Sequence, residues 1–208
     1  FMDSNFLASV GRSIAMSIIP IIVTIVIVLL ALFVTAIYFP KLEKYVQIIC
    51  MIPYTIQGVI LSVSILSLYV GSSSILSNRL VMLMGAYCIV ILPYIYQGIR
   101  NGMRAVNMPT LIEAAEMLGA SKIYAFFRVV VPNILSAIIV SSLLAVGIIF
   151  GDYVLIRNLA GTSAPNMQIF LYQTMKSDST KASAVFVVIM FVTFVITAIV
   201  LFVKSREA

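Results

Sequence analysis

Residues 13–39 read SIAMSIIPIIVTIVIVLLALFVTAIYF, and no charged residue interrupts them. About 20 apolar residues suffice to cross the hydrocarbon core of a bilayer, so this stretch predicts a spanning helix with some tilt or an interfacial turn. The whole chain agrees with it: 62% of the 208 residues are hydrophobic and 10% are charged, and the mean hydropathy is +1.17. These values are typical of an integral membrane protein and exclude an ordinary soluble domain.

Four further apolar segments follow the first, at residues 45–70, 80–99, 129–151 and 182–203. Pro53 and Gly58 interrupt the second segment and Pro93 lies in the third, so we expect kinks there. Residues 152–181 are too polar to span as a whole. The sequence therefore predicts an all-α integral membrane protein with five spans, forming one domain over residues 1–208.

The basic residues lie singly or in small groups at the ends of the apolar runs, so the net charge of +6 indicates topology and not a nucleic-acid partner. On an alternating five-span path, one side holds Lys41, Lys44, Arg100, Arg104, Lys122, Arg128, Lys204 and Arg206. The other side holds Arg12, Arg79, Arg157, Lys176 and Lys181. Eight positive charges against five place the loop at about 100–128 and the C-terminus in the cytoplasm, and the chain in the cytoplasmic membrane. The start of the chain then lies outside, so we expect a further span ahead of Phe1.

The sequence lacks the residues that several kinds of chemistry require. The chain has no histidine, and Cys50 and Cys88 lie within apolar runs without a C-x-x-C spacing. A zinc site, histidine-based catalysis and a disulfide framework are therefore unsupported. The chain also has no Gly-x-x-x-x-Gly-Lys-Ser/Thr phosphate loop, so it is not an ATPase by itself. We expect no catalytic residue, no metal site and no cofactor in this chain.

A short polar island, Glu113-Ala114-Ala115-Glu116-Met117-Leu118-Gly119, lies in the predicted cytoplasmic loop. Thr110 and Glu113 fit a capping box, which predicts a helix from about Thr110 to Leu118. Gly119 can adopt the left-handed conformation that ends it, and Ser121 can cap a following helix.

Ala114 and Ala115 leave this predicted helix open to close approach by another protein's backbone, which suits docking into a groove. The pattern alone is equally compatible with an amphipathic helix that lies on the bilayer surface.

The order Glu113-Ala114-Ala115, three residues, Gly119, nine residues and Val129-Val130-Val131-Pro132 resembles the signature of the permease subunits of ATP-binding-cassette importers. In that family the pattern is Glu-Ala-Ala, three residues, Gly, nine residues, Ile, any residue, Leu and Pro. Valines replace the Ile and the Leu here, and the spacing is kept. The resemblance covers most of the chain and is closest to the type I importer permeases.

This resemblance implies a six-helix subunit, often with a core of five, which pairs with a second permease copy or a paralogue. It implies that the loop helix docks onto a separate nucleotide-binding ATPase subunit, which binds ATP and Mg²⁺, and that an external solute-binding protein delivers the solute. The ATPase-coupling residues would be Thr110, Glu113, Ala114, Ala115, Glu116, Gly119 and Pro132. Glu113 would stabilise the helix start and pair with a basic residue of the ATPase subunit, although a capping role alone is the alternative.

Polar residues within or beside the spans are candidates for a translocation path. They are Gln57, Ser62, Tyr94, Gln97 and Asp152. The alternatives are hydrogen bonds to neighbouring helices for the uncharged residues, and a structural pair with Arg157 for Asp152.

The segments Gly151-Asp152-Tyr153-Val154 and Met167-Gln168-Ile169-Phe170-Leu171-Tyr172 resemble those of permeases for polyamines and aminophosphonates, with ferric ion and thiamine permeases as near relatives. An acidic residue near the outer mouth favours a cationic solute such as a polyamine.

Two other classes are less well supported. A secondary, ion-coupled transporter would carry more intramembrane ionisable groups or inverted repeats. A membrane-embedded enzyme would need a reactive constellation that the sequence lacks.

Overall fold

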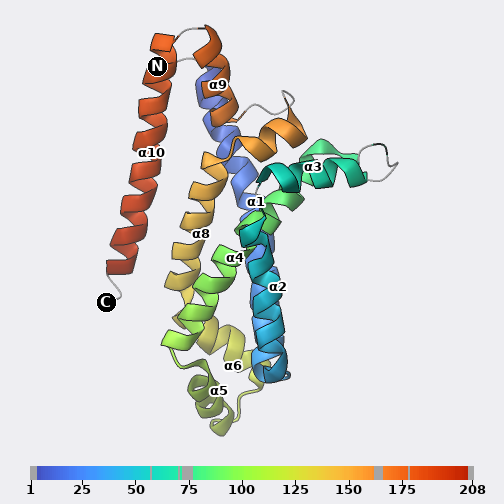
Figure 1. The fold of residues 1–208 in the computed structure, drawn as a ribbon. Coiled ribbons are helices and arrows are strands. Elements are labelled where there is room, and N and C mark those ends of the chain that lie inside the picture. The colour runs from blue at the N-terminus through green and yellow to red at the C-terminus, as the bar shows by residue number, and fades with distance from the viewer. Residues whose placement is uncertain are drawn as a thin grey trace.

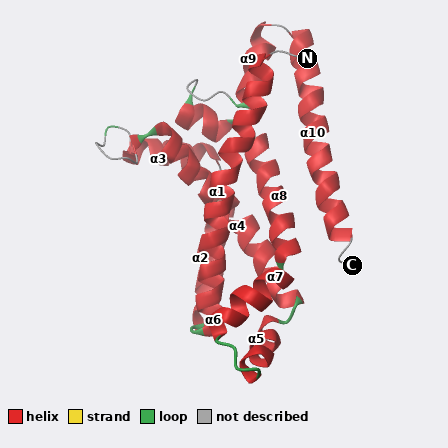
Figure 2. Ribbon diagram, turned by 180° about the vertical axis from the view of Figure 1, so that it is seen from behind, coloured by secondary structure: helices red, strands yellow, loops and turns green. Residues whose placement is uncertain are grey.

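The structure is a computed structural model that describes residues 4–56, 58–69, 71, 77–161, 166–177 and 179–205. Every regular element in these ranges is helical (Figure 2). Five helices have roughly aligned axes and form an upright bundle (Figure 1). They are α1 (Ser4–Ile37), α2 (Glu43–Thr55), α4 (Arg79–Ala105), α8 (Leu135–Gly151) and α10 (Ser179–Ser205).

Shorter elements close the two ends of the bundle (Figure 1). The short turn η1 (Pro40–Leu42) joins α1 to α2. At the same end lie α5 (Met108–Met117), α6 (Lys122–Ala125), the π-helical turn η3 (Phe126–Val130) and α7 (Val131–Asn133). Toward the opposite end lie α3 (Gly58–Tyr69), the π-helical turn η4 (Ile156–Ala160) and α9 (Met167–Ser177). The bundle therefore has one end built around α5 and another built around η4 and α9.

The predicted spans correspond to helices, but two of them are not straight. By length and composition, α1 and α4 can each cross a membrane alone, and two bent pairs can each form one span. The pairs are α2 with α3, which meet at 100°, and residues 122–133 with α8, which meet at 64°. The last predicted span falls on α10, where only the shorter stretch Ser179–Val195 is apolar. Among the described residues, the helices therefore supply two spans, or up to four if each bent pair is one span, against the five predicted. The expected kink near Pro53 and Gly58 is thus a sharp bend, whereas α4 continues through Pro93 to Ala105.

Helix α4 lies at the centre, because it contacts α1, α2, α3, α5, α8 and η4. Its side chains Leu83, Ala86, Ile91, Ile95 and Ile99 have no exposed area. A central helix that is covered on several faces needs apolar residues around most of its circumference. Among the described residues, this helix therefore contributes more buried hydrophobic side chains than any other element.

The contact between α4 and α8 depends on small residues. A Cβ atom at Gly98 would lie 2.5 Å from the Cβ of Ser141, and one at Gly102 would lie 2.6 Å from the Cβ of Ala137. These four residues form a Gly-x-x-x-Gly pair facing an Ala-x-x-x-Ser pair, which is the arrangement that lets membrane helices approach closely. The G-x-x-x-G spacing is a sequence signal for this contact, which was not among the predictions.

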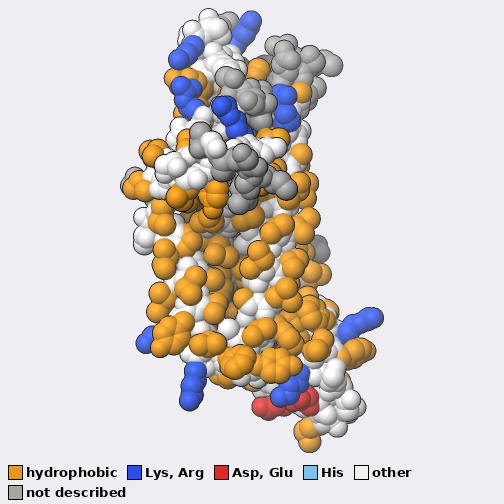
Figure 3. All heavy atoms as spheres, turned by 90° about the vertical axis from the view of Figure 1, so that its right-hand side faces the viewer, with side chains coloured by type: hydrophobic (Ala, Val, Ile, Leu, Met, Phe, Trp, Pro, Cys, Tyr) orange, Lys and Arg blue, Asp and Glu red, His pale blue; other side chains and the backbone are white. Residues whose placement is uncertain are grey.

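The surface has the polarity of a membrane protein. Hydrophobic side chains cover the middle of the face shown in Figure 3, and Lys and Arg side chains gather toward the two ends. Large apolar side chains are exposed along the upright helices, as at Ile22 and Ile27 of α1 and Ile48 and Ile49 of α2. Such exposure is costly in water and natural in lipid. The all-helical, several-span membrane fold predicted from the sequence is confirmed.

Candidate functional site

The polar island forms α5 at one end of the molecule, but the helix does not begin as predicted. It starts at Met108, two residues before Thr110, and no side chain caps it. Asn107 precedes it in the left-handed conformation, with φ of 48°, and Pro109 occupies the first turn. Proline suits that position because its missing N–H would be unpaired there in any case. The capping box of Thr110 and Glu113 was therefore wrong, and both side chains lie exposed within the helix.

Helix α5 has an inner and an outer face. Met108, Ile112 and Ala115 are buried, and their spacing of four and three residues is that of one helical stripe. Thr110, Glu113, Ala114 and Glu116 are exposed. We predicted that both alanines would remain open to a partner, and this was wrong for Ala115, which packs against its own protein. Ala114 is the small residue on the outer face.

The end of α5 agrees with the prediction. Gly119 has φ of +86°, its N–H donates to the Glu116 carbonyl at 2.9 Å, and the Ala120 N–H donates to the Ala115 carbonyl at 3.0 Å. These two bonds are those of a Schellman motif, which satisfies the last carbonyls of a helix. Ser121 then accepts a hydrogen bond from the Tyr124 N–H at 3.3 Å and caps α6, as predicted.

The tip of α5 carries an apolar pair that we did not single out. Met117 and Leu118 are each 90% exposed, beyond the last buried residue of the stripe and just before the glycine turn. They end α5, which lies at one end of the molecule, beyond the upright helices (Figure 1). The sequence signal was available, since two large apolar residues adjoin a helix-ending glycine and fall off the buried face.

Ion pairs connect the elements at this end. Glu116 of α5 lies 3.8 Å from Lys122 of α6. On the inner side, Arg100 of α4 donates to Glu43 of α2 from Nη2 at 2.7 Å and from Nε at 2.9 Å. The Glu116 carboxylate is thus paired within its own chain, with the Lys122 ammonium group of the neighbouring helix α6.

Pro132 lies at the bend that leads from this end into α8. The Val131 N–H bonds to the Phe126 carbonyl, five residues back, so the chain forms a π-turn before the proline. A π-turn of this kind avoids the clash between a proline ring and the carbonyl four residues earlier. The path from α5 to α8 therefore passes through α6, η3 and Pro132.

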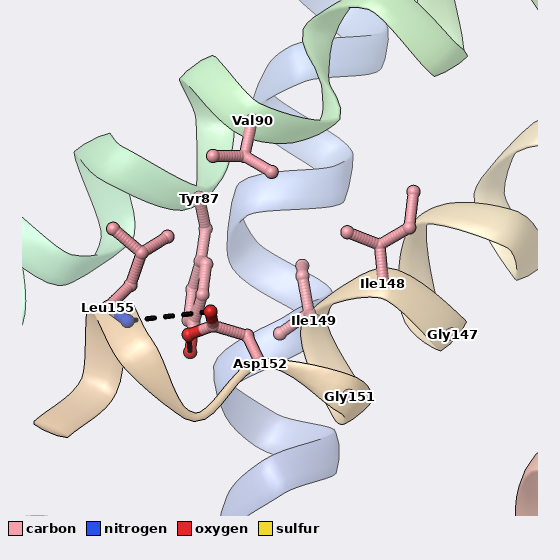
Figure 4. Close-up of a pocket in the computed structure, with 8 residues that line it drawn as sticks. All are labelled: Tyr87, Val90, Gly147, Ile148, Ile149, Gly151, Asp152 and Leu155. Carbon is pink, nitrogen blue, oxygen red and sulfur yellow. Dashed lines mark hydrogen bonds between the residues drawn. The ribbon is translucent and has the colours of Figure 1, made fainter. Parts of the chain in front are cut away.

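At the other end, Asp152 follows α8 and lines a cavity of about 300 Å³ with Tyr87 and Val90 of α4. The Tyr87 hydroxyl donates to Asp152 Oδ2 at 3.2 Å. The backbone N–H groups of Leu155 and Ile156 donate to the same carboxylate at 3.4 and 3.3 Å. Figure 4 shows the carboxylate between Tyr87 and the turn at Leu155. Asp152 therefore caps the helical turn that follows it.

The structural pair that we considered between Asp152 and Arg157 does not form. The guanidinium carbon of Arg157 lies 5.7 Å from the ring centroid of Tyr153 and 5.0 Å from that of Tyr172. The ammonium group of Lys176 lies 4.8 Å from the Tyr172 ring. A hydrogen bond from Lys176 lowers the pKa of the Tyr172 hydroxyl. This end thus presents two cations held over half-buried aromatic rings.

The other candidates for a translocation path differ in their surroundings. Ser62 is fully buried and accepts a hydrogen bond from Asn158 Nδ2 at 2.8 Å, which is the bond between neighbouring elements that we gave as the alternative. Tyr94 is half-buried and its ring centroid lies 5.8 Å from that of Tyr54. Gln97 is exposed and donates to the Met51 sulfur at 3.2 Å. Gln57 lies outside the described residues.

The described ranges contain no group of three His, Cys, Asp or Glu side chains that could hold a metal ion.

An all-helical bundle with an apolar band and a protruding end helix defines a multi-spanning membrane protein. Residues 13–206 match the family described as binding-protein-dependent transport system inner membrane component. The match covers most of the chain, and the protein belongs to this family. No curated protein matches the chain. The chain is thus the inner-membrane permease component of a transport system and not its ATPase subunit. Transport in this family depends on a solute-binding protein and, generally, on an ATPase partner.

Proposed function

We propose that this chain forms half of a solute path through the inner membrane and that α5 docks onto a separate ATPase subunit in the cytoplasm. The observation that carries the proposal is the exposed pair Met117 and Leu118 at the tip of α5. Burial of one such side chain is worth about 1.5–3 kcal/mol. Two adjacent apolar side chains exposed at an aqueous end of a protein indicate a surface that a partner covers.

The outer face of α5 suits a groove on that partner. Ala114 offers a small surface for close approach, Glu113 and Thr110 offer polar groups, and the two apolar residues lie at the tip. An amphipathic helix that lies on the bilayer is the alternative given above. The buried stripe disfavours this alternative, because the apolar residues Met108, Ile112 and Ala115 face the protein and not the bilayer.

Motion of the docked ATPase subunit would reach the membrane through covalent and packed elements. The Glu116–Lys122 pair joins α5 to α6, and η3 and Pro132 lead from α6 into α8. Helix α8 packs on α4 through the glycine contact, so a displacement of α5 would act on the centre of the bundle. Pairing with a second permease subunit, a copy or a paralogue, completes the path in this proposal.

The solute in this proposal is a small polar organic molecule, such as a polyamine or an aminophosphonate. The acidic residue that favoured a polyamine is Asp152, and its carboxylate already accepts hydrogen bonds from Tyr87, Leu155 and Ile156. These three donors are uncharged, so they do not neutralise the carboxylate. Tyr94 and Gln97 remain candidates for the path, together with the cavity beside Asp152.

The coupling proposal is tested by co-purification of the ATPase subunit with the assembled importer. In the variant Met117→Ser/Leu118→Ser, we expect the bound ATPase subunit to fall at least about tenfold, since two apolar contacts are lost. Met175→Ser is the matched control, because Met175 is also exposed but lies on α9 at the opposite end. Full association of the ATPase subunit with the double variant would refute the docking role of α5.

The solute is tested by reconstituting the complex with its binding protein and measuring stimulation of ATP hydrolysis. A polyamine, an aminophosphonate, ferric ion and thiamine are compared at equal concentration. We expect stimulation by one of the two organic classes. Stimulation only by ferric ion or thiamine would overturn the proposed class and leave the coupling role intact.

A further inference from the structure

A cavity of about 500 Å³ lies at the α5 end, between the last turns of α1, the start of α2, the end of α4 and the start of α5. Leu32 and Ala36 form an apolar part of its wall, and Glu43, Arg100 and Arg104 form a charged part. The docking surface proposed above uses the outer face and tip of α5. This cavity lies behind the first turn of α5, toward the bundle.

The charged part of the wall has a net positive charge. Arg100 makes both of its close bonds to one oxygen of Glu43, whereas Arg104 Nη2 lies 3.6 Å from that same oxygen. The Arg104 side chain is 63% exposed and that of Arg100 is 15% exposed. One carboxylate therefore faces two guanidinium groups, and Arg104 keeps donors available for another anion.

The N-terminus of α5 opens on the same cavity. Asn107, Met108 and Pro109 line it, and no side chain caps this ten-residue helix. Pro109 has no N–H and the Asn107 N–H donates to the Arg104 carbonyl at 3.1 Å. The Met108 N–H and the helix dipole are therefore what this N-terminus offers to an anion. Together with Arg104, the cavity thus combines a guanidinium group and a helix N-terminus on one apolar-walled space.

The surroundings indicate the depth at which the cavity opens. Tyr38, Phe39, Leu42 and Tyr45 are between 46% and 63% exposed and lie where α1 passes through η1 into α2. Exposed aromatic residues beside lysines, here Lys41 and Lys44, are typical of the level of the lipid headgroups. The apolar surface of α1 and α2 continues from there toward the middle of the bundle.

We propose that this cavity binds the phosphate of an anionic phospholipid headgroup, held by Arg104 and the N-terminus of α5. Basic pockets between membrane helices on the cytoplasmic side suit such headgroups, and the acyl chains would lie on the exposed apolar faces of α1 and α2. A headgroup bound here touches α4 and α5 together. It therefore ties the position of the docking helix to the bilayer.

The test uses the assembled importer, purified in mild detergent, incubated with phosphatidylglycerol or phosphatidylcholine of the same chain length and examined by native mass spectrometry. We expect phosphatidylglycerol to be retained over phosphatidylcholine, and Arg104→Gln to lower its retention about fivefold. Arg128→Gln is the matched control, because Arg128 is exposed on the same predicted side but does not line the cavity. We expect it to retain the lipid as the wild type does.

Three results with lipid or phosphate would overturn the proposal, and a fourth would assign the cavity to another occupant. They are equal retention of the two lipids, unchanged retention in Arg104→Gln, and displacement of phosphatidylglycerol by inorganic phosphate at equimolar concentration, which would indicate a free phosphate site. A cross-link from Arg104→Cys to the ATPase subunit, without bound lipid, would assign the cavity to the protein partner instead. The co-purification of the ATPase subunit is measured separately, so failure here leaves the docking role of α5 untouched.

Discussion

Glycines are decisive in two regions of this protein for opposite reasons. Where α4 meets α8, Gly98 and Gly102 are needed because a Cβ atom would lie only 2.5 or 2.6 Å from Ser141 or Ala137. At the end of α5, Gly119 has open space around it and is needed for its φ of +86°. The first region is closed by its own side chains, whereas the second presents apolar side chains to its surroundings. Substitutions should therefore damage folding in the first region and assembly in the second.

The largest effect is expected at the α4–α8 contact. Gly98→Ala and Gly102→Ala each force the two helices apart, and overpacking of this kind costs about 1–3 kcal/mol. We expect a lower unfolding temperature and a lower yield of purified protein. Gly85→Ala is the control, because Gly85 lies on the same helix with nothing within 4 Å of an added Cβ. If Ser141→Gly fails to restore the stability of Gly98→Ala, the close approach is not the cause.

A second substitution examines the cap at the opposite end from α5. Asp152→Ala removes the acceptor for the amides of Leu155 and Ile156, and loss of such a cap costs about 1–2 kcal/mol. We expect lower thermal stability with the ATPase subunit still bound. Asp152→Asn should recover part of the stability, since one acceptor oxygen remains. An Asp152→Ala variant that is stable but transports no solute would instead assign this residue to the path.

The smallest effect on stability is expected at Gly119. Gly119→Ala places a Cβ in the left-handed region, at a cost of about 1 kcal/mol, but this Cβ would meet no side chain within 4 Å. We expect little change in the unfolding temperature and weaker association of the ATPase subunit, because the tip of α5 is displaced. Gly11→Ala, at a helical position with open space, serves as the comparison. A large loss of stability in Gly119→Ala would contradict the local role of this glycine.

The sequence predicted the class of fold and the location of α5. The composition and the lengths of the apolar runs indicate which segments lie in lipid and which lie in water, and this does not require knowledge of tertiary contacts. It did not predict where α5 begins. Asn107 adopts φ of 48° and Pro109 fits the first turn, so the helix starts without the capping box. It also did not predict that α4 runs past Arg100, since the carboxylate that pairs with this charge belongs to Glu43, distant in the sequence.

The candidate site was predictable only where local signals decide it. The glycine turn at Gly119 and the cap at Ser121 depend on neighbouring residues, and both are confirmed. The burial of Ala115 and the capping role of Asp152 depend on contacts with other elements, as does the bond between Asn158 and Ser62. Spacing along the chain cannot supply those contacts.

The most direct test of the docking role of α5 is cross-linking from a photoreactive amino acid placed at Leu118 in the assembled importer. The same amino acid at Ala115, which is buried against its own chain, and at Met175, on the opposite end, provides the comparison. We predict that Leu118 cross-links to the ATPase subunit and that Ala115 and Met175 do not. The absence of a cross-link from Leu118 to the ATPase subunit, with the complex intact, would contradict the proposal.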